Sequence, residues 1–153
     1  MLSWFSSPLP VGSVAPPFMA PDQDGTVFIL NQHRNKHVVL VFYPGDDTPI
    51  CTKQLCELRD NYGALREAGA YVAGVNPAKD ASHSAFKEKH KLPFPLLVDH
   101  GKRVATMYNC NGPLVRRTVY VIDRDGKIAY AKRGNPTVEE ILTVMSPRTA
   151  ARR

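Results

Sequence analysis

The sequence predicts an α/β fold in which a mixed central β-sheet is flanked by helices. Three observations lead to this prediction: strand-like and helix-like patterns alternate early in the chain, an antiparallel hairpin follows them, and a helix comes last. Alternating strands and helices are typical of parallel sheets covered by helices, and a hairpin adds antiparallel strands. The 153 residues are expected to form one domain, residues 1–153, because this length supports a single core.

The N-terminal segment is predicted to contain neither a helix nor a central strand. Its first 21 residues include five prolines, which break helices and interrupt strand pairing. We expect an extended segment on the surface, with residues 1–10 as an N-terminal arm. The Asp24-Gly25 turn then precedes a short strand over residues 26–30.

The strongest strand signal is the continuous apolar run of residues 38–43, which is typical of a strand buried on both faces. A loop over residues 44–49 follows. Apolar residues then recur at helical spacing and predict a helix over residues 50–68, with Gly69 ending it; they are Leu55, Leu58, Tyr62 and Leu65.

The remaining elements continue the alternation. A strand is expected at 71–75, a helix at 81–91, a short strand at 95–98 and a helical segment at 102–108. Strands at 117–122 and 127–131 flank Asp125-Gly126, a strong hairpin signal. This order of elements favours a thioredoxin-like sandwich of a mixed sheet and helices.

The C-terminal end of the chain is predicted to hold one more helix and a basic tail. Thr137 and Glu140 have the spacing of a capping box, and the helix is expected to end near Met145. Residues 147–153, which are rich in arginine, are expected to be disordered.

Composition narrows the class of protein. No apolar run is long enough to span a bilayer, and the N-terminus lacks the pattern of a secretion signal, so a cytoplasmic protein is expected. The net charge of +6 comes from scattered lysines and arginines without a recognised motif, which argues against nucleic-acid binding. Three cysteines are too few for a disulfide scaffold and indicate catalytic or metal-binding thiols instead.

Cys51 and Cys56 carry the clearest chemical signal in the chain. Cys51 follows the buried strand and opens the predicted helix, where backbone N–H groups and the helix dipole favour a thiolate. A nearby second thiol can trap the product of its oxidation. The pair therefore indicates redox chemistry, although the sequence alone does not choose which cation accompanies Cys51.

Helix geometry places a condition on this pair. Residues five apart on a helix point about 140° from one another, and their Cα atoms lie roughly 8 Å or more apart. A disulfide requires a shorter separation. A bond between Cys51 and Cys56 therefore requires the first turns of the helix to unwind.

The pattern Pro44-x-x-x-Thr48-x-x-Cys51 resembles the active-site signature of the peroxiredoxins. Residues 42–60, including the second cysteine, resemble the peroxiredoxin Q or bacterioferritin-comigratory-protein subfamily. Further similarity extends over residues 9–145, with Arg117 on the strand that resembles the family's catalytic-arginine strand.

The resemblance implies a thiol-dependent peroxidase with an antioxidant role in cell redox homeostasis. Cys51 would be the peroxidatic cysteine and Cys56 the resolving one, with hydrogen peroxide and organic hydroperoxides as substrates. Thr48 would hydrogen-bond the thiolate and peroxide, Arg117 would stabilise their charge, and Pro44 would shield the thiolate from water. Thioredoxin or a similar dithiol would reduce the disulfide, no cofactor would be needed, and a monomer is expected.

Two residues depart from the family pattern. Gly45 and Ile50 stand where the family usually has lysine and glycine, and the β-branched Ile50 is expected to stiffen the loop or narrow access. Arg116 precedes Arg117, and strand alternation is expected to point it to the opposite face.

The cysteines and histidines also admit other interpretations. Cys51 and Cys56 could be inert core thiols, and a metal site is disfavoured by their spacing. Cys110 is expected to be a free thiol, with a second resolving thiol or a glutathionylation site as its alternative. His83 and His90 are expected to be solvated on one face of a helix.

Two other functions remain open from the sequence. A redox sensor or interaction protein would use the disulfide as a switch and would show negligible turnover. A general thiol–disulfide oxidoreductase is disfavoured because the chain lacks C-x-x-C.

Overall fold

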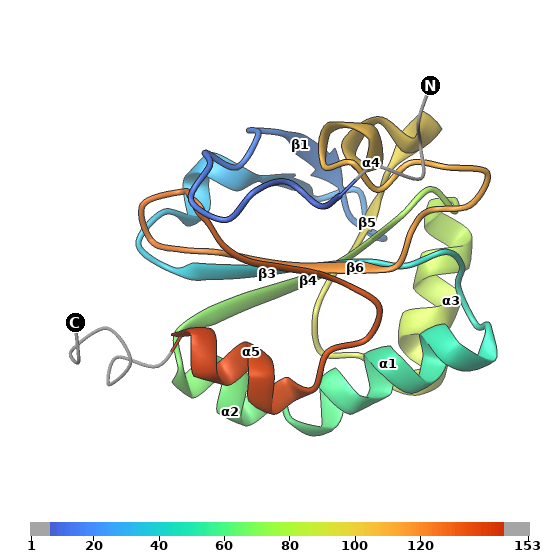
Figure 1. The fold of residues 1–153 in the computed structure, drawn as a ribbon. Helices are drawn as coiled ribbons and strands as arrows, with labels where there is room; N and C mark the ends of the chain where they lie inside the picture. Colours follow the sequence, from blue (N-terminus) through green and yellow to red (C-terminus); the bar gives the residue numbers. More distant parts are fainter. Residues whose placement is uncertain (1–6, 146–153) are drawn as a thin grey trace.

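The computed structural model describes residues 7–145, and its centre is a five-stranded mixed sheet (Figure 1). Across the sheet the strands are β5 (Leu96–Val98), β4 (Ala70–Asn76), β3 (His37–Phe42), β6 (Thr118–Ile122) and β7 (Ile128–Arg133). Strands β3, β4 and β5 run parallel, whereas β6 is antiparallel to β3 and β7 is antiparallel to β6. The mixed sheet predicted from the sequence is confirmed.

Helices cover one face of this sheet, which is the lower face in Figure 1. They are α1 (Pro49–Asp60), α2 (Tyr62–Glu67), α3 (Asp80–His90) and α5 (Val138–Met145). Their apolar side chains pack with those of the sheet in one buried cluster, called here the lower core, which contains Cys51.

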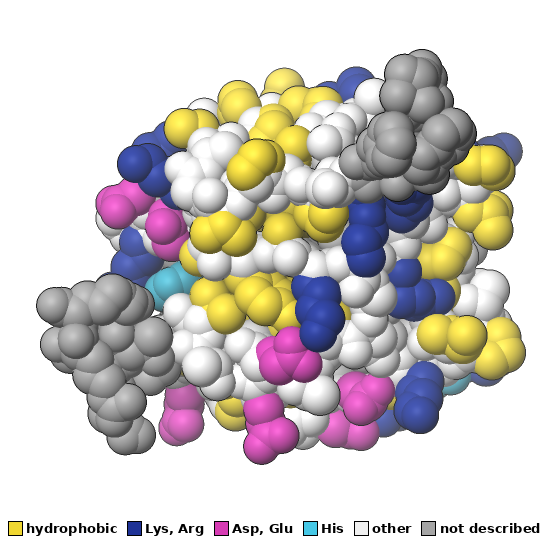
Figure 2. All heavy atoms as spheres, viewed as in Figure 1, with side chains coloured by type: hydrophobic (Ala, Val, Ile, Leu, Met, Phe, Trp, Pro, Cys, Tyr) yellow, Lys and Arg dark blue, Asp and Glu magenta, His cyan; other side chains and the backbone are white. Residues whose placement is uncertain are grey.

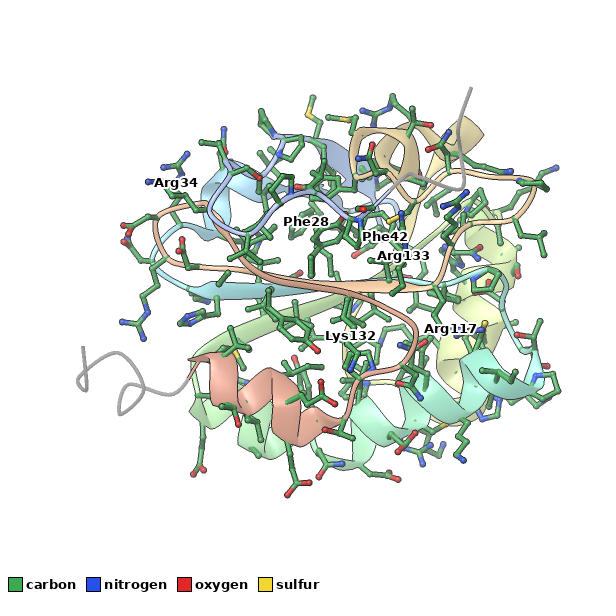
Figure 3. All side chains as sticks on the ribbon, viewed as in Figure 1. Phe28, Arg34, Phe42, Arg117, Lys132 and Arg133 are labelled. Atoms are coloured by element: carbon green, nitrogen blue, oxygen red, sulfur yellow. The ribbon has the colours of Figure 1, made fainter. Side chains whose placement is uncertain are left out.

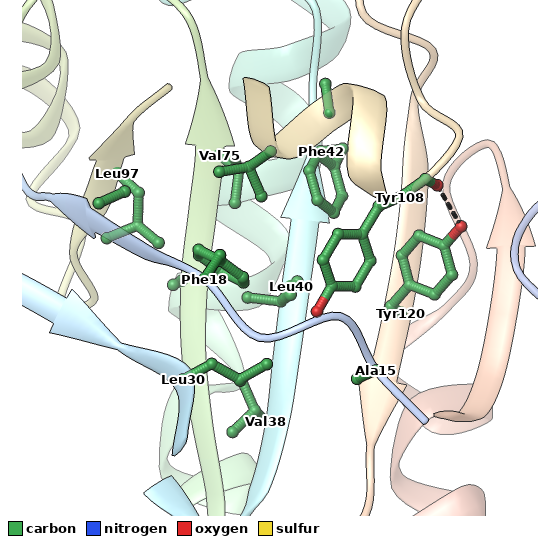
Figure 4. Packing of buried hydrophobic residues seen from close by; sticks show 14 of the residues in the cluster. Ala15, Phe18, Leu30, Val38, Leu40, Phe42, Val75, Leu97, Tyr108 and Tyr120 are labelled. Atoms are coloured by element: carbon green, nitrogen blue, oxygen red, sulfur yellow. Dashed lines mark hydrogen bonds between the residues drawn. The ribbon is translucent and has the colours of Figure 1, made fainter. Parts of the chain in front are cut away.

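The opposite face carries a second buried cluster, called here the upper core (Figure 4). It is covered by a two-stranded sheet of β1 (Met19–Pro21) and β2 (Val27–Ile29), the 3₁₀ turns η2 (Leu30–His33) and η3 (His100–Lys102), and α4 (Arg103–Met107). Its tyrosines are joined by a hydrogen bond in which the Tyr120 hydroxyl donates to the Tyr108 carbonyl.

Strand β3 explains why the sheet needs both cores. Its side chains alternate between them: Leu40 and Phe42 lie in the upper core, and Val39 and Val41 lie in the lower core. Successive side chains of a strand point to opposite faces, so a strand covered on both sides is apolar throughout. The continuous apolar run in the sequence follows from this arrangement.

The single helix expected over residues 50–68 is wrong, because the chain forms two helices there. Asn61, with φ −115° and ψ 15°, separates α1 from α2. Its side-chain amide donates to the Glu57 carbonyl at 2.8 Å, which replaces a main-chain bond of the helix. Gly69, with φ +85°, follows the second helix and ends it as expected.

The N-terminal segment holds a strand that its proline content did not reveal. Residues 19–21 pair antiparallel with β2 at a sheet edge, where a terminal proline is tolerated. The predicted arm, residues 1–10, is described only from Ser7 onward, and the predicted tail, residues 147–153, lies outside the described residues.

The predicted capping box at the start of α5 is confirmed. The Glu140 N–H donates to the Thr137 hydroxyl at 3.1 Å, and the Thr137 N–H donates to the Glu140 carboxylate at 3.5 Å. None of the helices within residues 7–145 has the length and apolar character required to cross a bilayer.

Gly74 in β4 leads to a stability prediction. A Cβ added there would lie 2.8 Å from Cδ2 of Leu96 and 3.0 Å from Cε1 of Tyr43. We expect Gly74→Ala to lower the free energy of unfolding by about 1–3 kcal/mol, because the core would be overpacked. Urea denaturation followed by circular dichroism measures this.

Gly63→Ala provides the matched control for Gly74→Ala. A Cβ at residue 63 would meet nothing within 4 Å, and this residue is helical. Alanine should therefore raise the free energy of unfolding by about 0.5–1 kcal/mol. Equal destabilisation by both substitutions would contradict the packing explanation.

Candidate active site

Cys51 lies at the start of α1 and is fully buried. Thr48 is the N-cap and Pro49 is the first helical residue, a position that proline favours. The first helical hydrogen bond runs from the Thr52 N–H to the Thr48 carbonyl at 2.8 Å, so the N–H of Cys51 precedes the helical ladder. The positive end of the helix dipole therefore acts on the Cys51 sulfur.

Arg117 brings a full positive charge to the same sulfur. One terminal nitrogen of its guanidinium donates to Cys51 Sγ at 3.2 Å, and the other donates to the Gln54 side-chain oxygen at 2.7 Å. Figure 3 places Arg117 between the sheet and α1. Both the guanidinium and the helix dipole stabilise negative charge on the sulfur.

Strand alternation explains why Arg117, and not Arg116, reaches Cys51. In β6, Val119 and Val121 face the lower core, and Arg117 continues their side of the strand. The Arg116 side chain instead lies near Gly112, in the loop that precedes β6. The choice of Arg117 as the residue beside the cysteine agrees with this geometry.

Gln54 is a member of the site that the sequence reasoning missed. It follows Cys51 by three residues, which places both side chains on one face of α1. Only 1% of Gln54 is exposed, and its Nε2 atom has no hydrogen-bond partner among the described residues. Gln54 is a polar residue beside Leu55 on the apolar stripe of the helix, and this pattern could have indicated a buried functional side chain.

Cys56 lies on α1 but away from Cys51. The helix is continuous between them, so their Cα atoms are about 8–9 Å apart by helix geometry. Cys56 is partly exposed, and all three cysteines of the chain are free thiols in this structure. The structure thus places the two thiols in the arrangement that was predicted to prevent a disulfide in the intact helix.

Pro44 and Thr48 lie in the loop before Cys51, and among the described residues neither hydrogen-bonds its sulfur. The Thr48 side chain is exposed, and its hydroxyl donates to the Gly45 carbonyl at 3.3 Å. Pro44 is partly buried and stands two residues after the end of β3. Ile50 is 64% exposed, so its side chain faces outward from α1.

Comparison with known proteins identifies the family of this chain. The family model described as AhpC/TSA family matches residues 11–131. The chain belongs to this family, the peroxiredoxins. Peroxiredoxin Q proteins named chloroplastic, from Oryza sativa subsp. japonica and Triticum aestivum, are 44% and 45% identical over 123 residues.

Coverage differs between these relatives and a solved structure. The aligned part is 78% of this chain and 57% of each plant relative, so the chain spans little more than half their length. A crystal structure of peroxidoxin BcpB from Mycobacterium tuberculosis has a TM-score of 0.82 at 30% identity, covering 88% of this chain and 95% of that chain. This similarity confirms the predicted thioredoxin-like fold of a peroxiredoxin.

Cys110 of this peroxiredoxin chain lies in the upper core, on the other side of the sheet from Cys51. Burial raises the pKa of the Cys110 thiol, although hydrogen bonds and charge from Thr118 and Arg133 partly oppose this. Arg133 Nη1 lies 3.8 Å from the sulfur. The two buried thiols therefore occupy separate compartments of the fold.

The expectation that both helix histidines are solvated is wrong for His83. Its side chain has no exposed surface, because α3 packs this face against β5. His90 is 21% exposed and pairs with Asp47 at 3.1 Å. Within residues 7–145 there is no cluster of three potential metal ligands.

The contact between Arg117 and Cys51 leads to a kinetic prediction. Arg117→Met should lower the rate constant for Cys51 oxidation by hydrogen peroxide about 10²–10³-fold, because it removes a preorganised charge at the reacting sulfur. Mass spectrometry of protein quenched at successive times measures this rate constant. Arg116→Met is the matched control and should change it less than about twofold, since this side chain lies elsewhere. Equal losses in both variants would contradict a specific role for Arg117.

Proposed function

We propose that this chain is a thiol-dependent peroxidase that reduces hydrogen peroxide and organic hydroperoxides through Cys51. The observation that carries the proposal is the position of the Cys51 sulfur, at a helix N-terminus and 3.2 Å from the Arg117 guanidinium. The guanidinium and the helix N-terminus stabilise negative charge on the sulfur as it attacks, and the thiolate is the nucleophilic form of cysteine. Membership of the peroxiredoxin family supports the same reaction.

In the first step the Cys51 thiolate attacks one oxygen of the peroxide. A sulfur–oxygen bond forms and the oxygen–oxygen bond breaks, which leaves a sulfenic acid and releases water or an alcohol after protonation. Arg117 stabilises the charge that develops on the leaving oxygen. Thr48 and Pro44, in the loop before α1, serve as the hydrogen-bonding residue and the shield against water.

In the second step the Cys56 thiol attacks the sulfenic sulfur. A disulfide forms, and the sulfenic oxygen leaves as water. Because α1 holds the two cysteines apart, this step requires its first turns to unwind. Thioredoxin or a similar dithiol then reduces the disulfide by thiol–disulfide exchange and becomes oxidised itself.

The assembly and location of the protein follow from the same scheme. A resolving thiol in the same chain removes the need for a second subunit, so the enzyme acts as a monomer. Its three free cysteines fit a reducing compartment such as the cytoplasm. Cys110 has no role in this cycle, since the sheet separates it from Cys51.

The coupled peroxidase assay tests the proposed function. With thioredoxin, thioredoxin reductase and NADPH, the protein should consume hydrogen peroxide over many turnovers, and Cys51→Ser should abolish this because it removes the nucleophile. Full activity of Cys51→Ser would end the proposal. Stable partner complexes without turnover would favour a redox sensor, and insulin reduction without peroxide would favour an oxidoreductase.

Peptide mapping tests the resolving step separately. After one equivalent of peroxide, non-reducing mass spectrometry should find Cys51 linked to Cys56, because unwinding of the first turns of α1 brings the two sulfurs together. Cys110→Ser should leave the yield of this link unchanged, since Cys110 lies in the upper core. A link from Cys51 to Cys110, or between two chains, would refute the role of Cys56.

A further inference from the structure

A group of hydrogen-bonded polar side chains lies close to the proposed active site, where the loop before α1 meets α3. Its centre is Asp46, whose side chain is only 5% exposed. One carboxylate oxygen accepts a hydrogen bond from the Tyr43 hydroxyl at 2.7 Å. The other accepts from the Ser82 hydroxyl at 2.7 Å and lies 2.7 Å from Nδ1 of His83. Asp46 is thus held by one residue at the end of β3 and two residues of α3.

His83 is bound on both sides of its ring. Its Nε2 atom faces the carbonyl oxygens of Leu97 at 2.9 Å and Asn76 at 3.2 Å. A carbonyl oxygen only accepts, so Nε2 is the donor to these two oxygens, while Nδ1 faces the Asp46 carboxylate. The ring therefore joins α3 and the ends of β4 and β5 to the loop.

The loop residue Asp46 is ionised in this arrangement. Burial alone opposes ionisation, but the hydrogen bonds from His83, Tyr43 and Ser82 lower the pKa of Asp46 below its ordinary value. Removing a hydrogen-bond partner from a buried carboxylate leaves its charge without compensation, which is strongly unfavourable. The pair therefore restricts the loop far more than a surface contact would.

A second pair follows in the same loop but lies at the surface. The Asp47 carboxylate accepts from Lys89 Nζ at 2.8 Å and pairs with His90 Nε2 at 3.1 Å. The Asp47 side chain is 47% exposed, and exposed pairs contribute little to stability. Two successive loop carboxylates thus contact the same helix with very different strengths.

The position of Asp46 connects the buried pair to the cysteine. It stands two residues before the N-cap Thr48 and five before Cys51, so the place where Asp46 is held determines where α1 begins. We propose that the Asp46–His83 pair is a positioning device that holds the loop and the first turn of α1 in the peroxide-reactive arrangement, against the unwinding that Cys56 needs. This inference deepens the proposed function and rests on its disulfide step.

The proposal assigns opposite effects to the two steps of the cycle. Contacts made only in the folded site lower the fraction of molecules in which α1 is unwound. When that fraction is small, weakening the contacts tenfold raises it about tenfold and barely lowers the fraction that is folded. The disulfide step should therefore accelerate while the peroxide step changes little.

Asp46→Asn tests this directly, because it removes the charge and retains the shape of the side chain. We expect the first-order rate of Cys51–Cys56 disulfide formation to rise on the order of tenfold, and the second-order rate of sulfenic acid formation to fall less than about twofold. Rapid quenching with mass spectrometry follows both products. Ser82→Ala removes one donor and should raise the disulfide rate roughly threefold, and it serves if Asp46→Asn does not fold.

Asp47→Asn is the matched control. It alters the neighbouring carboxylate at the surface, and asparagine tolerates the left-handed backbone found there, with φ +56°. Both rates should stay within about twofold of the wild-type values. An unchanged disulfide rate in Asp46→Asn, or a fall in both rates together, would overturn the proposal.

Hydrogen exchange separates failure of this proposal from failure of the proposed function. In the reduced protein, without peroxide, Asp46→Asn should speed amide exchange about tenfold in the first turns of α1, while β3 and β4 stay protected. Uniformly faster exchange would indicate general destabilisation and would overturn the positioning role. If the wild-type protein forms no disulfide, the proposed function fails. The amide exchange rates of Asp46→Asn still test whether the Asp46–His83 pair holds the first turns of α1.

Discussion

The hydrogen bond between Arg117 and the Cys51 sulfur is the contact on which the rest of the structure depends. It joins two residues that are 66 positions apart in the chain: Arg117, directly before β6, and Cys51, in the first turn of α1. The pairing of β6 with β3 carries Arg117 to the correct end of the sheet, and strand alternation turns it toward the lower core. Buried Gln54 holds the other arm of the guanidinium, so the charge is directed at one atom.

The same helix meets two opposing demands. Cys51 needs an intact first turn to remain beneath Arg117, but Cys56 reaches it only when that turn opens. The break at Asn61 confines any such opening to a short helix, because α2 is a separate element. The loop before α1 is in turn bound to α3, so the balance between the two states is set by residues outside the reacting pair.

Sequence reasoning predicted the parts of the fold that local patterns determine. The apolar run of β3, the hairpin of β6 and β7 and the capping box at Thr137 all have short-range signatures. Alternation in the strand also predicted that Arg116 and Arg117 point to opposite faces. These predictions succeeded because each depends on neighbours in the chain.

The features that were missed depend on distant packing. The burial of His83 arises from α3 lying on β5, and nothing in the helix pattern distinguishes it from the partly exposed His90. Asp46 has the appearance of an ordinary loop carboxylate until its donors from α3 are placed around it. The end of α1 depends on a side-chain amide that competes with the backbone, which propensity does not reveal.

Because the sheet separates the two cores, the three thiols report on different movements of the chain. Cys56 is partly exposed on α1, whereas Cys110 is enclosed among the aromatic rings of the upper core. A reagent that modifies Cys110 can enter only when that core opens, so its rate of modification follows unfolding of the whole domain. Cys51 lies buried within the first turn of α1 and becomes accessible when that turn opens, which is a smaller movement. The rates at which Cys51 and Cys110 are modified therefore distinguish opening of the first turn of α1 from unfolding of the whole domain.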